Sequence, residues 1–161
     1  MKIEINKLGN FEFLVRYPNQ YKEGEKYPVI LMLHGAGGRG RDMQMIIKDN
    51  PFFVITEQME EFPFITVAPQ CNLNNWFDHF ESLRELVRWV ADAPFTDPER
   101  IYGAGMSMGG YGIWQLAQSM PKYFAAIVPI CGGGMAWNAG RLANVPVWAH
   151  HGDSDRAVDP Q

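Results

Sequence analysis

The stretch Ile101-Tyr102-Gly103-Ala104-Gly105-Met106-Ser107-Met108-Gly109-Gly110 decides the fold. Its first half is an apolar run typical of a buried strand, and a helical pattern follows its second half at once. Ser107 is therefore expected on a tight turn between a strand and a helix. Glycines two positions to either side leave room for the neighbouring backbone, and the turn lifts the serine hydroxyl clear of the sheet. The start of the following helix adds a positive partial charge at this point.

Strand-like and helical segments alternate along the rest of the chain, and all strands but the first are continuously apolar. Continuous apolarity is typical of parallel strands that are covered on both faces, whereas the alternating first run indicates an outer antiparallel strand. The pattern predicts a single α/β domain over residues 1–161, with a mostly parallel sheet flanked by helices. The predicted strands are Phe11–Arg16, Val29–Leu33, Phe64–Ala68, Ile101–Gly105, Ala125–Ile130 and Val145–Ala149. The predicted helices are Asp42–Met59 with a break at Asn50-Pro51, Glu81–Ala91 and Gly109–Ser119.

The composition excludes several classes of protein. The chain has 161 residues, of which 47% are hydrophobic and 20% charged, with a net charge of −4 and no basic stripe to bind nucleic acid. Its apolar runs are too short to span a bilayer, and its first residues lack the apolar stretch of a signal peptide, so we expect a cytoplasmic location. The two cysteines do not suggest a disulfide scaffold. No spacing suits a metal site or a dinucleotide, so no metal and no cofactor are expected.

Two groups of residues could cooperate with Ser107 as a nucleophile. The small residues of His34-Gly35-Ala36-Gly37-Gly38 follow a predicted strand and leave backbone N–H groups free to hold a developing negative charge. We assign these oxyanion donors to the N–H of Met108 and the N–H of Ala36, with Gly37 as the alternative for the second. His34 is interpreted as a structural residue of this loop rather than a general base.

A carboxylate follows the last predicted strand, in His151-Gly152-Asp153-Ser154-Asp155. Its position suits the acid that orients a histidine in the order Ser…Asp…His. Asp153 and Asp155 are both candidates, and the plain alternative is that both only form a turn.

Six segments, in this order and spacing, resemble the phospholipase/carboxylesterase group of α/β-hydrolases, which is related to dienelactone hydrolases and feruloyl-esterase-like enzymes. The likeness runs from about Tyr27 to the C-terminus. It implies ester hydrolysis and makes Asp155 the acid, because this aspartate begins an Asp-x-x-Val segment with Val158; Asp159 interrupts the commoner Val-Pro pairing before Pro160. The segments are Leu33–Gly38, Ala68–Cys71, Arg100–Tyr102, Gly105–Gly112, Phe124–Gly133 and Val145–Asp155.

The resemblance also implies a catalytic histidine after one more helix and strand, whereas no histidine follows Asp155 in this sequence. We therefore expect a C-terminally truncated α/β-hydrolase that lacks its last strand and helix and is nearly inactive alone. Its last strand would be an unprotected edge, open to strand-edge association or oligomers. The implied strand order places the strand before Cys71 three positions from the strand before Cys131, which predicts free thiols.

The functional hypothesis is a serine carboxylesterase that cleaves a small ester through an acyl-enzyme on Ser107. Gly37 and Trp76 are candidates for the substrate pocket, although Trp76 could equally pack its loop. The alternatives are a non-catalytic binding module and a peptidase on the same scaffold. The acyl and alcohol groups are not determined by the sequence.

Overall fold

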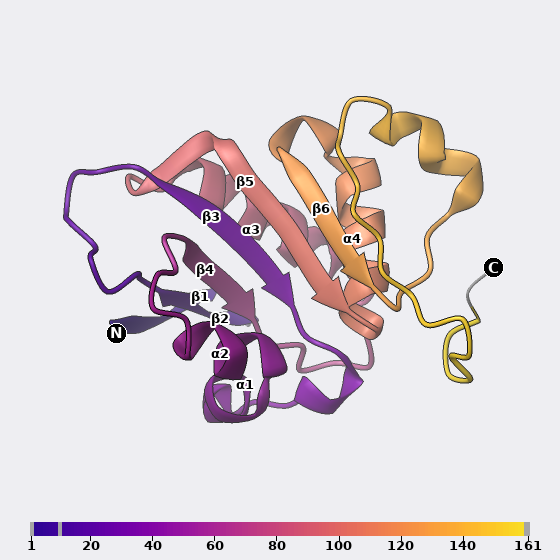
Figure 1. The fold of residues 1–161 in the computed structure, drawn as a ribbon, viewed down its shortest axis with the longest axis horizontal. Coiled ribbons are helices and arrows are strands. Elements are labelled where there is room, and N and C mark those ends of the chain that lie inside the picture. Colours follow the sequence, from indigo (N-terminus) through magenta and orange to yellow (C-terminus); the bar gives the residue numbers. More distant parts are fainter. Residues whose placement is uncertain (1, 10, 160–161) are drawn as a thin grey trace.

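The structure, a computed structural model, describes residues 2–9 and 11–159. Pro160, named above for the acid segment, and Gln161 lie outside these residues. A six-stranded sheet in the order β1-β2-β4-β3-β5-β6 forms the centre of the molecule (Figure 1). The strands are β1 (Ile3–Leu8), β2 (Phe11–Arg16), β3 (Tyr27–Leu33), β4 (Ile65–Pro69), β5 (Thr96–Met106) and β6 (Ala126–Ile130).

The four strands β4, β3, β5 and β6 are parallel, whereas β1 and β2 form an antiparallel hairpin at one side. The predicted mostly parallel α/β sheet is thus confirmed. Strand β1 was not predicted, because an edge strand that is half exposed carries too many charged residues to resemble a buried one. In the sheet register Leu33 lies beside Gly105, and Met106 lies beside Ile130. The loops that follow β3, β5 and β6 therefore meet at the carboxyl edge.

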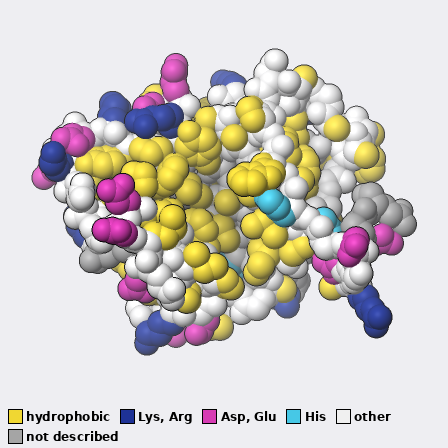
Figure 2. Space-filling view, in the orientation of Figure 1, with side chains coloured by type: hydrophobic (Ala, Val, Ile, Leu, Met, Phe, Trp, Pro, Cys, Tyr) yellow, Lys and Arg dark blue, Asp and Glu magenta, His cyan; other side chains and the backbone are white. Residues whose placement is uncertain are grey.

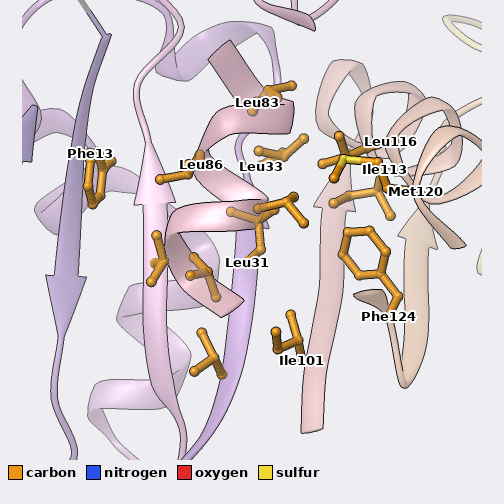
Figure 3. Close-up of a cluster of buried hydrophobic side chains, with 14 of the residues drawn as sticks. Phe13, Leu31, Leu33, Leu83, Leu86, Ile101, Ile113, Leu116, Met120 and Phe124 are labelled. Atoms are coloured by element: carbon orange, nitrogen blue, oxygen red, sulfur yellow. The ribbon is translucent and has the colours of Figure 1, made fainter. Parts of the chain in front are cut away.

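Helices lie on both faces of the sheet (Figure 1). Helices α3 (Phe80–Asp92) and α4 (Met108–Ser119) pack on one face, where Figure 3 shows Leu83 and Leu86 of α3 close to Leu31 and Leu33 of β3. Helices α1 (Met43–Asp49) and α2 (Pro51–Glu57) lie on the other face, where Met43 and Ile46 pack against Met32.

The break predicted in the first helical segment is confirmed. Asn50 ends α1 and caps α2, and its side-chain oxygen accepts a hydrogen bond from the N–H of Phe52 at 3.0 Å. Pro51 occupies the first position of α2, where its missing N–H costs nothing. Three short 3₁₀ helices complete the structure: η1 (Ala36–Gly38), η2 (Pro121–Tyr123) and η3 (Ala136–Leu142).

The strand predicted at residues 145–149 is only partly correct. This segment runs parallel to β6, but only Val147 and His150 form β-bridges, to Ile127 and Ile130. Pro129 of β6 interrupts the ladder because it has no N–H to donate to this segment, whereas the Pro146 carbonyl accepts the Ile127 N–H at 3.0 Å. The outer side of the segment has no neighbouring strand among the described residues, and Trp148 is 69% exposed there. Figure 2 shows hydrophobic side chains gathered across the middle of the face in view, where Figure 1 draws β3, β5 and β6.

The strand order keeps the two cysteines apart. Strand β4 is separated from β6 by β3 and β5, so Cys71 and Cys131 follow strands three positions apart. Both thiols are free, as predicted. Among the described residues no helix is long and apolar enough to cross a membrane.

Candidate active site

Ser107 occupies a strained turn at the end of β5. Its backbone dihedrals are φ 54° and ψ −118°, and α4 begins at the next residue. A positive φ on a non-glycine residue costs about 1–3 kcal/mol and persists only where its surroundings enforce it. The N–H of Ser107 donates to the Ile130 carbonyl at 2.8 Å, which ties the turn to β6.

The glycines around Ser107 are required because no side chain would fit at their positions. A Cβ on Gly105 would overlap the Gly109 carbonyl oxygen, and a Cβ on Gly109 would overlap the Leu33 carbonyl oxygen. Helix α4 therefore starts closer to β3 and β5 than any residue with a side chain would allow. This is the strand–turn–helix geometry that the sequence predicted.

The loop after β3 lies directly beside the serine. A Cβ placed on Gly35 would lie 3.7 Å from the Ser107 Cβ and 3.3 Å from the Met106 carbonyl oxygen. Ala36 and Met108 are the first residues of η1 and α4, positions whose N–H groups have no acceptor within their own helix. In the part of the chain that the structure describes, no other group accepts a hydrogen bond from either N–H.

His34 is locked into this loop by both ring nitrogens. Its Nε2 accepts a hydrogen bond from the Cys71 N–H at 3.0 Å, so the proton is on Nδ1, which donates to the Gly35 carbonyl at 2.6 Å. Burial lowers the pKa of His34 and keeps the ring neutral. Neither nitrogen is free to take a proton from Ser107. The ring also fills the space beside Gly38, where a Cβ would lie 2.6 Å from the His34 Cγ.

Trp76 packs beneath its loop, which is the second of the two roles that the sequence left open. Its side chain is 1% exposed and belongs to the core beneath the loop. The indole Nε1–H donates to the His34 carbonyl at 2.9 Å, and the two rings lie 4.8 Å apart. Trp76 therefore supports the loop from below, and the prediction that it lines the substrate pocket finds no support in this burial.

Gln70 holds the far end of the same loop, a role that the sequence analysis missed. Its buried Nε2 donates to the carbonyls of Gly38 and Asp42, both at 3.1 Å. Next to it, the Gly40 N–H donates to the Cys71 carbonyl at 2.9 Å. Residues 70–76, which we call the β4 clamp, thus fasten the loop of residues 34–40 at several points.

Asp155 lies in a turn after the segment that pairs with β6. Its Oδ1 accepts hydrogen bonds from the N–H groups of Val158 at 3.0 Å and Ala157 at 2.8 Å, and these bonds lower the pKa of the carboxyl group. The other oxygen, Oδ2, lies 3.6 Å from Nε2 of His151. Asp153 is exposed, and its Oδ1 accepts a hydrogen bond from the neighbouring Ser154 hydroxyl at 3.1 Å.

The remaining histidines have other surroundings. His79 is buried against the Phe11 ring, with ring centroids 4.9 Å apart. His151 Nε2 is 2.8 Å from the Val158 carbonyl, and the His150 ring lies 4.8 Å from that of Trp148. All four histidines are within the described residues, and none of them hydrogen-bonds to the Ser107 hydroxyl.

The strand order, the turn at Ser107 and the adjoining glycine loop define an α/β-hydrolase fold. The chain belongs to the Esterase family: the family model, described as "Putative esterase", matches residues 8–160.

Curated relatives and solved structures agree with this family. The chain is 23% identical over 155 residues to a probable feruloyl esterase C of Aspergillus flavus, covering 94% of this chain and 57% of the relative. It is 30% identical over 132 residues to a probable dipeptidyl-aminopeptidase B of Paracoccidioides brasiliensis, covering 73% of this chain and 14% of the relative. Among solved structures, a thermostable esterase superposes with a TM-score of 0.77 at 27% identity, covering 98% of this chain and 48% of the other. An acetyl xylan esterase of Aspergillus awamori, at 16% identity, shares the fold with a TM-score of 0.77, over all of this chain and 76% of the other. The chain thus spans 57% of the length of the feruloyl esterase and 14% of that of the aminopeptidase.

Proposed function

We propose that this chain carries the nucleophile, the oxyanion donors and the acid of a serine carboxylic ester hydrolase. The observation that carries the proposal is the positive-φ turn at Ser107, which lies so near the loop after β3 that a Cβ added to Gly35 would be 3.7 Å from the Ser107 Cβ. A strained backbone that presents a hydroxyl beside unpaired N–H groups is typical of a nucleophile elbow.

In the proposed reaction the Oγ of Ser107 attacks the ester carbonyl carbon while its proton passes to a general base. The carbonyl oxygen becomes an oxyanion, held by the N–H groups of Met108 and Ala36, with Gly37 as the alternative for the second. Collapse of this intermediate expels the alcohol, which takes up the proton, and leaves an acyl group on Ser107 that water removes in the same way. Each such donor contributes about 10²–10³ to kcat in serine hydrolases.

Asp155 is proposed as the acid that would orient the imidazole of the base. Its Oδ1 is already occupied by its own turn, so Oδ2 is the oxygen available for this task. Because no described histidine reaches the Ser107 hydroxyl, we expect this chain alone to turn over about 10⁴–10⁶ times more slowly than a complete triad.

A fluorophosphonate tests the nucleophile, since it bonds to a serine hydroxyl beside an oxyanion hole and needs no second chemical step. Without a described base the reaction should be slow, so the incubation is long. After long incubation, intact-mass and peptide analysis should find the adduct on Ser107. Ser107→Ala should abolish it, whereas Ser154→Ala, a matched control on the exposed loop, should not. An adduct that persists in Ser107→Ala would overturn the proposal.

A peptidase on the same scaffold is the second candidate, favoured by the similarity to a probable dipeptidyl-aminopeptidase B. Ester and amide cleavage share the acyl-enzyme, so they differ in the leaving group. Matched ester and amide substrates with the same acyl group separate the two: faster release of the amine would favour the peptidase.

A further inference from the structure

Arg39 joins the loop after β3 to the β4 clamp. Its Nε donates a hydrogen bond to the Ala36 carbonyl at 3.0 Å, and its Nη1 donates to the Asn74 carbonyl at 2.9 Å. Both donors belong to one rigid guanidinium plane, and a charged donor makes a stronger hydrogen bond than a neutral one. The side chain is exposed, but these two bonds hold it against two separate segments of backbone.

The bond to Ala36 acts on one particular peptide group. The Ala36 carbonyl and the Gly37 N–H belong to the same peptide unit, and in a planar trans peptide they point in opposite directions. Arg39 approaches this carbonyl twice, because its backbone N–H also donates to it, at 3.3 Å. The peptide is thus held from its carbonyl side. The Gly37 N–H points away from Arg39 and donates to no group within the described residues.

The preceding peptide group is held in a similar way, but by a neutral side chain. The Ala36 N–H shares its peptide with the Gly35 carbonyl, which accepts from Nδ1 of His34 at 2.6 Å and from the Gly38 N–H at 3.0 Å. A hydrogen bond to a carbonyl polarises the peptide and strengthens the N–H on its other side, and a positive charge does so more than a neutral ring. The Gly37 N–H is therefore the more strongly polarised of the two candidate donors.

The charge of Arg39 is not neutralised by a carboxylate. None of the ion pairs among the described residues includes it. The charge also acts on the interior of the loop: burial lowers the pKa of His34 most, and the positive charge of Arg39 lowers it further. Because the loop lies beside Ser107, the same charge favours an oxyanion formed there.

We propose that Arg39 is a positioning residue for the hydrolysis at Ser107. It holds and polarises the Ala36–Gly37 peptide, so that the Gly37 N–H, rather than that of Ala36, is the second oxyanion donor beside the N–H of Met108. Arg39 acts through this peptide and does not touch the substrate. The inference rests on the proposed function.

The first test needs no chemistry at Ser107. Backbone ¹⁵N relaxation gives the order parameter of the Gly37 N–H, which should be about 0.85 in the wild type and fall below about 0.6 in Arg39→Met. Arg41→Met removes another exposed arginine two positions further on and should leave Gly37 rigid. Unchanged amide signals from β3 and β5 would show that both variants fold. If Gly37 stays equally rigid in Arg39→Met, Arg39 does not hold the peptide and the inference is wrong.

The second test measures how fast a fluorophosphonate labels Ser107. Loss of an oxyanion donor costs about 10²–10³ in rate, so a donor that is held less well in Arg39→Met should slow labelling about tenfold or more. Arg39→Lys keeps the charge but replaces the planar fork with a single ammonium group, and it should recover part of the rate. Arg41→Met should react at the wild-type rate.

The two proposals fail in different ways. If Arg39→Met is labelled as fast as the wild type, Gly37 is not the donor, and the nucleophile stands. If Ser107 of the wild type is never labelled, the hydrolase proposal fails and the donor role of Gly37 fails with it. Slower labelling together with a less ordered Gly37 in Arg39→Met would support both.

Discussion

The two sides of the candidate site are built differently. Around Ser107, backbone atoms of β3, β5 and α4 approach so closely that two glycines admit no side chain, and the β4 clamp fastens the neighbouring loop. Asp155, in contrast, lies on a largely exposed loop and is held mainly by two hydrogen bonds within its own turn. The surroundings of Ser107 are thus fixed by packing and those of Asp155 by local turn geometry, so substitutions around Ser107 should lower the stability far more.

The largest effect is expected from Gly109→Ala. The added methyl group would overlap the Leu33 carbonyl oxygen, which belongs to the backbone of a central strand and cannot move aside. We expect a loss of at least about 3 kcal/mol in the free energy of unfolding, measured by urea denaturation. Gly140→Ala, where an added Cβ meets nothing within 4 Å, is the control and should change little. Equal urea midpoints for the two variants would contradict the view that close backbone packing fixes the surroundings of Ser107.

Trp76→Phe tests the β4 clamp. The substitution keeps an aromatic ring but removes the N–H that donates to the buried His34 carbonyl, and an unpaired buried acceptor costs about 1–3 kcal/mol. Trp137→Phe, on an exposed residue of η3, should leave the urea midpoint within the error. If Trp76→Phe is equally neutral, the clamp does not hold the loop.

Acidification should destabilise the folded chain. Burial lowers the pKa values of His34 and His79, so the folded protein keeps both rings neutral while the unfolded chain takes up protons as the pH falls through about 6.5. Stability is therefore full above this pH and declines below it. In His79→Phe the urea midpoint should depend less on pH between 7 and 5 than in the wild type. His150→Phe, at an exposed residue, should keep the wild-type slope, and a flat wild-type profile would contradict the prediction.

The smallest effect on stability is expected at the edge beside β6. Trp148→Lys should change the free energy of unfolding by no more than about 0.5 kcal/mol, because the side chain is exposed. It should, however, reduce the strand-edge association predicted from the sequence, since a lysine on an edge strand opposes pairing. Sedimentation velocity over a range of concentrations gives the readout; a wild-type chain that stays monomeric throughout would rule the association out.

The elements with strong local signals were predictable from the sequence. Gly105 and Gly109, at fixed spacing around Ser107 and between an apolar run and a helical pattern, located the elbow, and Asn50-Pro51 located the break between α1 and α2. The free thiols followed from the strand order that the resemblance implied.

What depends on contacts distant in sequence was not predictable. Gln70 and Trp76 hold the loop of residues 34–40 through hydrogen bonds to backbone carbonyls, which carry no sequence signature. A hollow beside the loop after β3 combines Met32, Met45 and Met106 from three different elements, and the packing of α1 against the sheet brings them together. The loss of regular pairing beside β6 comes from Pro129, and it depended on this residue facing the segment at 145–150 rather than β5.

Two consecutive hydrogen bonds connect the edge of the sheet to the turn at Ser107. The Ser107 N–H donates to Ile130, and the next N–H along, that of Cys131, donates to the His150 carbonyl at 2.7 Å. Fraying of the segment at 145–150 would thus loosen a hydrogen bond two strands away, at Ser107. The exchange rate of the Ser107 amide proton with solvent therefore reports whether the segment at 145–150 is paired with β6 or frayed.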